Sequence, residues 1–276
     1  MPAVTWINGL TAGAARGAAH AFVNLLPPLS VVAVLIVVWE VGVKALHVKQ
    51  YLLPPPSKIW IYLLTDYDLL WRGSVVTSTE IVIGFLISVA LGMPLGILVA
   101  RYRIFSLTMY PLIVASQTFP KLAIGPLLIV WFGFGQLPKL LLAILVSFFP
   151  IMINTIAGLN AVDDQTEMLA RSLGLGRFQT FFKIQLPQAL PFIFAGLKVG
   201  ITLAVIGVIV GEFLGTSAGL GFLIINATGT VDTVALFGVL VVLTVIGLVS
   251  YGIVAGLERV AIPWHYERRD VNIPAG

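Results

Sequence analysis

Residues 189–213 read ALPFIFAGLKVGITLAVIGVIVGEF and carry only two charged side chains, Lys198 and Glu212. About 20 predominantly apolar residues are enough for a helix to cross a hydrocarbon core of about 30 Å, and a helix satisfies its own backbone hydrogen bonds there. The stretch therefore predicts a transmembrane helix rather than an element of a soluble domain.

Five similar windows accompany this one, and together they predict an all-α membrane protein with about six transmembrane helices. The six windows are Leu29–Leu46, Val75–Ala100, Leu107–Phe132, Leu140–Leu159, Ala189–Phe213 and Val234–Leu257. The composition agrees, because 59% of the residues are hydrophobic and only 10% are charged, whereas about a quarter are charged in soluble domains. We expect one membrane domain, residues 29–265, between an N-terminal tail (1–28) and a C-terminal tail (266–276).

The distribution of Lys and Arg predicts the orientation, because short basic loops stay on the cytoplasmic side. With the N-terminus inside, the inner set is Arg16, Arg101, Arg103, Arg171, Arg177, Lys183, Arg259, Arg268 and Arg269. The outer set is Lys44, Lys49, Lys58, Arg72 and Lys139. This bias predicts that both termini are cytoplasmic. It also accounts for the net charge of +4, so no nucleic-acid partner is expected.

The connecting segments carry a few further signals. Leu53–Ser57, with three consecutive prolines, breaks the chain after the first window, and Lys58–Leu70 predicts a short amphipathic helix on the outer surface. The third and fourth windows are separated only by Gly133–Pro138, which predicts a tight hairpin turn. Leu214–Thr233 contains no Lys or Arg, as expected of an outer loop.

Sequence motifs for catalysis and for cofactor binding are absent. The chain has no cysteine, no G-x-x-x-x-G-K-[ST] phosphate loop, no H-E-x-x-H and no G-x-S-x-G. Its three histidines, His20, His47 and His265, are far apart in sequence. We therefore expect no catalytic residue, metal or cofactor on this chain. If transport uses ATP, another chain must bind it.

The segment Asp163–Pro187 is the one long polar interruption between apolar windows. Asp164 with Glu167 forms a capping-box pattern that starts a helix, and Gly174 ends it where a left-handed backbone is needed. A second short helix is predicted from Arg177, and Leu186-Pro187 is expected to redirect the chain into the fifth window. Its Phe and Leu residues either dip into lipid as an interfacial loop or contact a partner protein.

The spacing of Ala170, Gly174, Ile184 and Leu186-Pro187 resembles the cytoplasmic coupling motif of permease subunits of bacterial ATP-binding cassette (ABC) importers. The family's glutamate-alanine-alanine triplet falls on residues 168–170, with Glu167 displaced by one position.

Further motifs are similar to the nitrate, sulfonate and taurine type of importer permease. They are Leu53–Ser57, Gly92–Gly96, Pro126–Gly135, Phe148–Pro150 and Gly219–Gly221. Thr79–Phe85 and Gln117–Lys121 resemble members associated with pyrimidine-like, flavin-precursor or aromatic compounds.

The resemblance implies a type I importer permease fold in the bacterial inner membrane, with a coupling helix seated in a separate ATPase subunit that binds ATP and Mg²⁺. It also implies a second permease copy and a periplasmic or lipid-anchored substrate-binding protein. The transported solute would be small and polar or heteroaromatic. ATP-driven closure of the ATPase subunits would switch the path between inward-facing and outward-facing states.

Polar residues at membrane depth are candidates for the substrate path, because a polar group left against lipid is costly. The candidates are Glu80, Gln117, Thr118, Asn154 and Thr202. Pro120 follows Gln117 and Thr118 and is expected to free a backbone carbonyl and to make a local break in the third window. For each candidate residue, a structural hydrogen bond is about as well supported as solute contact, and Gln117 is the best single candidate. We expect structural pairing for Glu40, Lys198 and Glu212.

Gly207, Gly211 and Gly215 recur every four residues, as do Gly196, Gly200 and Ala204. Such small-residue stripes allow close helix packing. Packing within the subunit is the first interpretation, and a two-fold interface with a second copy is the alternative.

A second hypothesis for the whole chain is a secondary transporter or channel that works without ATP. It predicts membrane-embedded carboxylates or inverted repeats, and a membrane enzyme would need a catalytic cluster. The sequence shows no inverted repeat and no catalytic cluster, and its carboxylates Glu80 and Glu212 lie near the ends of their windows.

Overall fold

The computed structural model describes residue 27, residues 30–215 and residues 217–264, and every regular element in this part of the chain is a helix. The elements are a helix over residues 30–45, α2 (Pro56–Thr65), α3 (Tyr67–Arg101), α4 (Arg103–Thr118), η1 (Lys121–Ile124), α5 (Gly125–Phe132), α6 (Gln136–Asn160), α7 (Asp164–Ser172), α8 (Arg177–Thr180), η2 (Phe181–Gln185), α9 (Leu186–Phe213), α10 (Leu220–Gly229) and α11 (Thr233–Ala261). The predicted tails, 1–28 and 266–276, lie outside the described residues apart from residue 27.

Four helices are long and apolar enough to cross a membrane, and a bent pair makes a fifth candidate. The four are Tyr67–Arg101, Gln136–Asn160, Arg177–Phe213 and Thr233–Ala261, which match the second, fourth, fifth and sixth predicted windows. The first window, Leu29–Leu46, coincides with the helix over residues 30–45. The all-helical, multi-pass architecture is thereby confirmed.

The third window, Leu107–Phe132, is interrupted at Pro120, as the sequence predicts. It consists of α4 and the η1–α5 segment, which are bent by 83° with respect to each other. The break lies at Phe119 and Pro120, where Phe119 has an extended backbone (φ −75°, ψ 128°). Proline disfavours a helical conformation in the residue before it and cannot donate a backbone hydrogen bond.

The predicted surface helix Lys58–Leu70 is also divided differently. α2 ends at Thr65, and α3 begins at Tyr67, well before the predicted start of the second window at Val75. Asp66 leaves the helical conformation between them (φ −103°, ψ 24°). The short turn Gly133–Gly135 between α5 and α6 confirms the predicted hairpin, and both of these glycines have positive φ.

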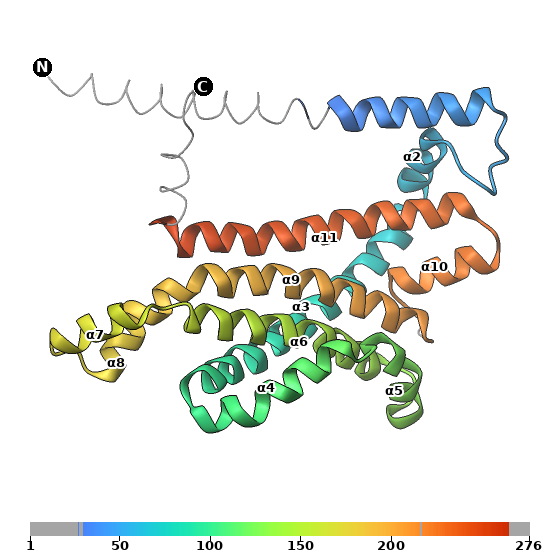
Figure 1. The fold of residues 1–276 in the computed structure, drawn as a ribbon. Coiled ribbons are helices and arrows are strands. Elements are labelled where there is room, and N and C mark those ends of the chain that lie inside the picture. The colour runs from blue at the N-terminus through green and yellow to red at the C-terminus, as the bar shows by residue number, and fades with distance from the viewer. Residues whose placement is uncertain (1–26, 28–29, 216, 265–276) are drawn as a thin grey trace, which may run out of the picture.

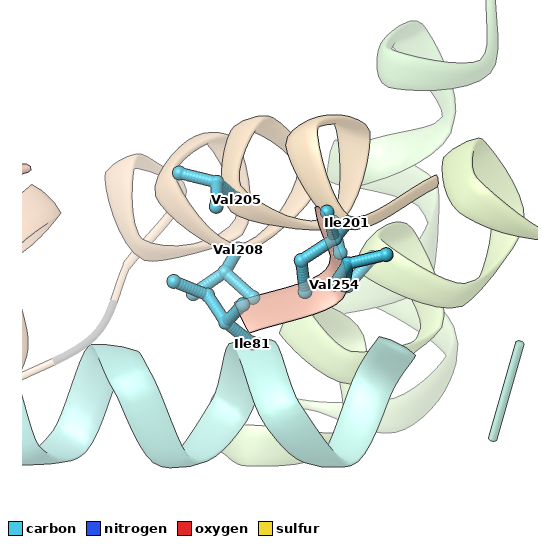
Figure 2. Close-up of a cluster of buried hydrophobic side chains, with 7 residues drawn as sticks. Ile81, Ile201, Val205, Val208 and Val254 are labelled. Atoms are coloured by element: carbon cyan, nitrogen blue, oxygen red, sulfur yellow. The ribbon is translucent and has the colours of Figure 1, made fainter. Parts of the chain in front are cut away.

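The core lies where α6 packs between α3 and α9. Buried Ile81 of α3, Ala143 of α6 and Val208 of α9 belong to one apolar cluster, to which α11 adds Val254 (Figure 2). Glycines bring the backbones close together: a methyl group on Gly84 would lie 2.8 Å from the Cβ atom of Ala143.

The two ends of this bundle carry different features (Figure 1). α7 and α8 extend from one end, between α6 and α9 in sequence. α10 and the α5–α6 turn lie at the opposite end. Any coupling between the two ends therefore has to travel along the long helices.

Candidate functional site

The polar segment at one end of the bundle folds as two short helices, as predicted. α7 begins at Asp164, and the carboxylate of Asp163 accepts a hydrogen bond from the backbone N–H of Gln165 at 3.3 Å. The observed cap is therefore one residue earlier than the predicted Asp164–Glu167 capping box, whose two side chains lie outside the described part.

Gly174 ends α7 in the manner the sequence predicts. Its φ of +76° is left-handed, and the N–H of Leu175 donates to the carbonyl of Ala170 at 3.0 Å. This bond is the six-to-one bond of a Schellman cap, which favours glycine at this position. Ala170 itself is 1% exposed, so the small residue of the motif packs inward.

Large apolar side chains cover the outside of this segment. Met168, Leu169, Leu173, Phe178 and Phe182 are between 48% and 75% exposed. The rings of Phe178 and Phe182 pack together with their centroids 4.5 Å apart. We call these five residues the apolar coupling surface. An exposed apolar group of this size on a polar segment is typical of an interaction site.

Leu186-Pro187 does not redirect the chain, which corrects the prediction. The helix continues from α8 through η2, a π-helical turn, into α9, and the whole stretch Arg177–Phe213 forms one span. A π-turn widens the hydrogen-bond ladder, so the N–H of Leu186 reaches the carbonyl of Phe181. Pro187 directly follows this turn, and a local π adjustment of the ladder lets a helix accommodate a residue that has no N–H. Ile184 and Pro187 line a cavity of about 510 Å³ together with Thr166 and Trp264.

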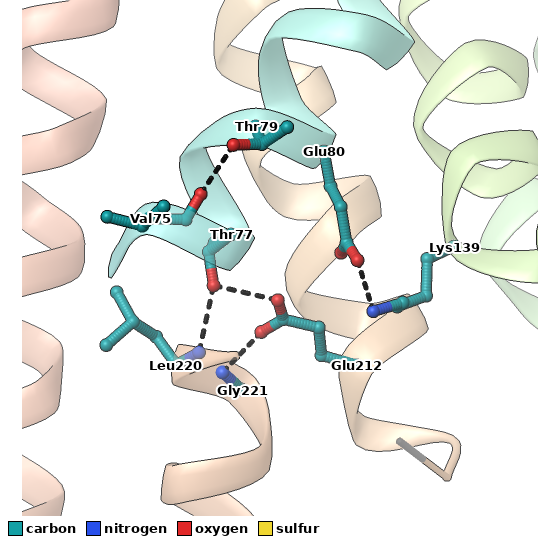
Figure 3. Close-up of polar contacts among 8 residues, drawn as sticks. All are labelled: Val75, Thr77, Thr79, Glu80, Lys139, Glu212, Leu220 and Gly221. Carbon is teal, nitrogen blue, oxygen red and sulfur yellow. Dashed lines mark hydrogen bonds and ion pairs between the residues drawn. The ribbon is translucent and has the colours of Figure 1, made fainter. Parts of the chain in front are cut away.

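A buried polar cluster lies at the opposite end of the bundle (Figure 3). It consists of Thr77 and Glu80 of α3, Lys139 of α6 and Glu212 of α9, and all four side chains are buried. Sequence reasoning missed the cluster as a unit, because its members come from two predicted windows and from the connection just before a third.

Glu212 holds the start of α10. Its carboxylate accepts hydrogen bonds from the backbone N–H of Gly221 at 2.5 Å and from the hydroxyl of Thr77 at 2.7 Å. Thr77 in turn accepts the N–H of Leu220 at 2.8 Å. The first N–H groups of a helix lack partners within the helix and favour a nearby negative charge. The carboxylate thus stabilises α10 against α3 and α9.

Glu80 and Lys139 form a buried ion pair between α3 and α6 and point toward each other in Figure 3. Lys139 was expected among the exposed outer charges, but only 4% of it is exposed. It lies in the first turn of α6, and its partner Glu80 is 59 residues away in sequence. Removing one member would leave the other as a buried charge without compensation.

The remaining predicted path residues are not brought together. Thr118, Asn154 and Thr202 each donate to a carbonyl of their own helix, at 2.8, 2.9 and 2.9 Å. Gln117 is exposed near the α4 break. Among the described residues, no hydrogen bond joins any two of the five candidates, so a solute contact at these positions stays a prediction.

The structural pairs expected from the sequence are confirmed. Glu40 pairs with Lys44 at 2.5 Å, and Lys198 of α9 pairs with Glu258 of α11 at 2.8 Å. Glu212 is paired within the polar cluster.

The glycine stripe packs inside the subunit. A methyl group on Gly207 would lie 2.7 Å from the Cα atom of Ala143, and one on Gly211 would lie 2.7 Å from the Cα atom of Lys139. Gly215 lies beyond the end of α9 and packs against the ring of Phe134. These contacts favour packing within the subunit, because the close neighbours of the three glycines belong to the same chain.

Fold and site define a polytopic helical membrane protein with an exposed apolar surface at one end. Residues 92–261 match the family model of binding-protein-dependent transport system inner membrane components. The chain belongs to this family.

Two relatives and one solved structure support this family assignment. The chain is 33% identical to a probable ABC transporter permease protein of Haemophilus influenzae, over 83% of this chain and 94% of that protein. It is 32% identical to the formylaminopyrimidine transport permease protein ThiX of Halalkalibacterium halodurans, over 87% of this chain and 96% of the relative. Its fold is similar to a chain of the inward-facing MetNI methionine ABC transporter, with a TM-score of 0.61, 18% identity and coverage of 71% and 97% of the two chains. The protein is therefore a permease subunit of an ABC importer in the inner membrane.

Proposed function

We propose that this chain forms half of the translocation path of an ATP-driven importer and binds a separate ATPase through Asp163–Pro187. The observation that carries the proposal is the apolar coupling surface, held on two capped helices that project from one end of the bundle. Membership of the permease family supports it.

The proposal includes the partners that the residues and the relatives favour. Two copies of the chain would surround the path, and the ATPase subunits would bind ATP and Mg²⁺, because this chain has no phosphate loop. A periplasmic or lipid-anchored binding protein would deliver a small polar or heteroaromatic solute. The distribution of basic residues favours a cytoplasmic location for both termini and for the coupling segment.

Gly174 gives the sharpest test, because it combines a positive φ with open surroundings. Its φ is +76°, and no described atom lies within 4 Å of the position that an added methyl group would take. Gly174→Val therefore perturbs the backbone of the cap rather than the packing, at about 1–3 kcal/mol. Gly174→Asn is tolerated better, since asparagine adopts the left-handed conformation more readily. Gly176→Ala is the matched control, because Gly176 is equally open and has a φ of −67°.

The assay reconstitutes the permease with its ATPase and binding protein in vesicles and measures ATP-dependent solute uptake and co-purification of the ATPase. We expect Gly174→Val to lower both, with Gly174→Asn and Gly176→Ala close to wild type. Wild-type uptake and ATPase binding in Gly174→Val would refute the coupling role. Full uptake without any ATPase would favour the ATP-independent transporter instead.

A further inference from the structure

A cavity of about 470 Å³ adjoins the polar cluster, at the end of the bundle opposite the coupling segment. Its lining includes Val76 and Glu80 of α3, Phe134 and Gln136 around the α5–α6 turn, Lys139 of α6, and Ser217 from the loop after α9. The volume lies within the range of small-molecule sites, about 300–1,000 Å³. Few polar groups face such sites, and here they come from α3, α6 and the loop after α9.

Glu80, which lines this cavity, has one carboxylate oxygen without a hydrogen-bond partner among the described residues. Its Oε1 atom accepts from Lys139, whereas its Oε2 atom is buried and has no hydrogen-bond partner among the described residues. The side chain is 3% exposed. A buried acceptor without a partner is unfavourable by about 1–3 kcal/mol, more for a charged group. An N–H group of a ligand would remove this penalty.

The charged groups that line the cavity disfavour an anionic ligand. They are Glu80 and Lys139, which are already paired with each other. A sulfonate or nitrate would have to compete with the Glu80 carboxylate for the one ammonium group of Lys139, whereas a neutral solute would not.

The rim of the cavity offers a flat apolar contact. The ring of Phe134 is 76% exposed, and it lies against Gly215, where an added methyl group would be 2.5 Å from the ring. Aromatic rings favour stacked or edge-to-face contacts with other rings. A planar solute could therefore rest on Phe134 while its N–H group reaches toward Glu80.

We propose that this cavity binds the transported solute, and that the solute is an N–H-bearing heteroaromatic molecule without negative charge, with Oε2 of Glu80 as its acceptor. This deepens the proposed function and rests on it. Lys139 positions the carboxylate by holding Oε1.

The test measures binding of formylaminopyrimidine, uracil and ethanesulfonate to the purified permease–ATPase complex in detergent, without the binding protein. Titration calorimetry or saturation-transfer NMR reports the affinity. We expect one or both heteroaromatic probes to bind and ethanesulfonate not to bind. Glu80→Gln should weaken the binding about tenfold or more, the effect of losing a hydrogen bond to a charged group.

A second variant keeps the test decisive if Glu80→Gln does not fold. Ser217→Trp fills the cavity from its exposed rim without touching the buried pair, and we expect it to abolish binding. Leu137→Trp is its control, because Leu137 lies near the start of α6, at the same end of the bundle, is 49% exposed and does not line the cavity. Glu258→Gln controls for loss of a buried ion pair elsewhere and should leave binding unchanged.

The outcomes separate the two proposals. Binding that survives both Glu80→Gln and Ser217→Trp, binding of ethanesulfonate alone, or no binding of either heteroaromatic probe would overturn the cavity proposal. Cavity binding that follows the expected pattern, in a complex whose uptake does not depend on ATP, would overturn the proposed function and leave the cavity assigned.

Discussion

Gly219 is the position where a single methyl group should do most harm to the end of the bundle that carries the polar cluster. It precedes α10 with φ +107° and ψ 168°, a conformation that only glycine adopts readily. An added Cβ atom would overlap with the Oε1 atom of Glu212. The carboxylate would then have to leave Thr77 and the N–H of Gly221.

Two terms set the expected size of the Gly219→Ala effect. The backbone strain is about 1–3 kcal/mol, and the loss of buried hydrogen bonds at Glu212 adds about 1–3 kcal/mol. The middle of these ranges gives a loss of about 4 kcal/mol in the free energy of unfolding. At about 2–4 °C per kcal/mol, the midpoint of thermal unfolding should fall by roughly 8–16 °C.

The measurement is thermal unfolding of the detergent-solubilised protein, followed by fluorescence-detected size-exclusion chromatography. Gly229→Ala is the control, because Gly229 lies at the other end of α10 and no described atom would lie within 4 Å of a methyl group added there. We expect this control to unfold close to the wild-type temperature. A fall for Gly219→Ala no larger than that of Gly229→Ala would refute the role assigned to the Glu212 carboxylate.

Two further variants test the packing and the polar cluster in the same assay. Gly207→Ala places a methyl group 2.7 Å from the Cα atom of Ala143 and should lower the free energy of unfolding by about 1–3 kcal/mol. Gly247→Ala, in open surroundings on α11, should leave it unchanged. Equal effects of the two variants would contradict close packing of α6 against α9. Thr77→Val removes a donor to Glu212 and an acceptor for Leu220 and should lower it by about 1–3 kcal/mol. Thr79→Val removes only a bond to the carbonyl of Val75 on its own helix, so a loss as large as that of Thr77→Val would argue against the cluster.

Local signals in the sequence predicted the spans and the C-terminal cap of α7. Length and apolarity are enough to identify a transmembrane helix, and the left-handed requirement at Gly174 arises from the turn itself. The break at Pro120 was predicted, but the size of the bend was not, because proline alone does not decide it. Pro94 and Pro150 lie inside α3 and α6, which remain single helices, whereas Pro120 marks a bend of 83°.

The polar cluster was not predictable as a unit, because its contacts are long-range. Thr77 and Glu212 are 135 residues apart in sequence, and Lys139, which follows a predicted turn, has the sequence context of an exposed charge. The signal that could have found the cluster is the presence of Glu80 and Glu212 inside apolar windows, since carboxylates there need partners. Gly219–Gly221 was noted only as a family motif, although it contains the N–H group that binds Glu212.

α9 links the two proposed sites mechanically. It runs unbroken from Leu186, next to the π-turn η2, to Phe213, next to Glu212, and its 28 residues span about 42 Å at 1.5 Å per residue. Its glycines bring it so close to α6 that added methyl groups would meet α6 atoms at less than 3 Å, and α3 contacts α6 in the same way. Interiors packed this tightly respond as units rather than by continuous deformation. We therefore expect a force on Asp163–Pro187 to move α3, α6 and α9 together with the cavity. Access to the translocation path should change at the Phe119–Pro120 bend, where this packing is interrupted.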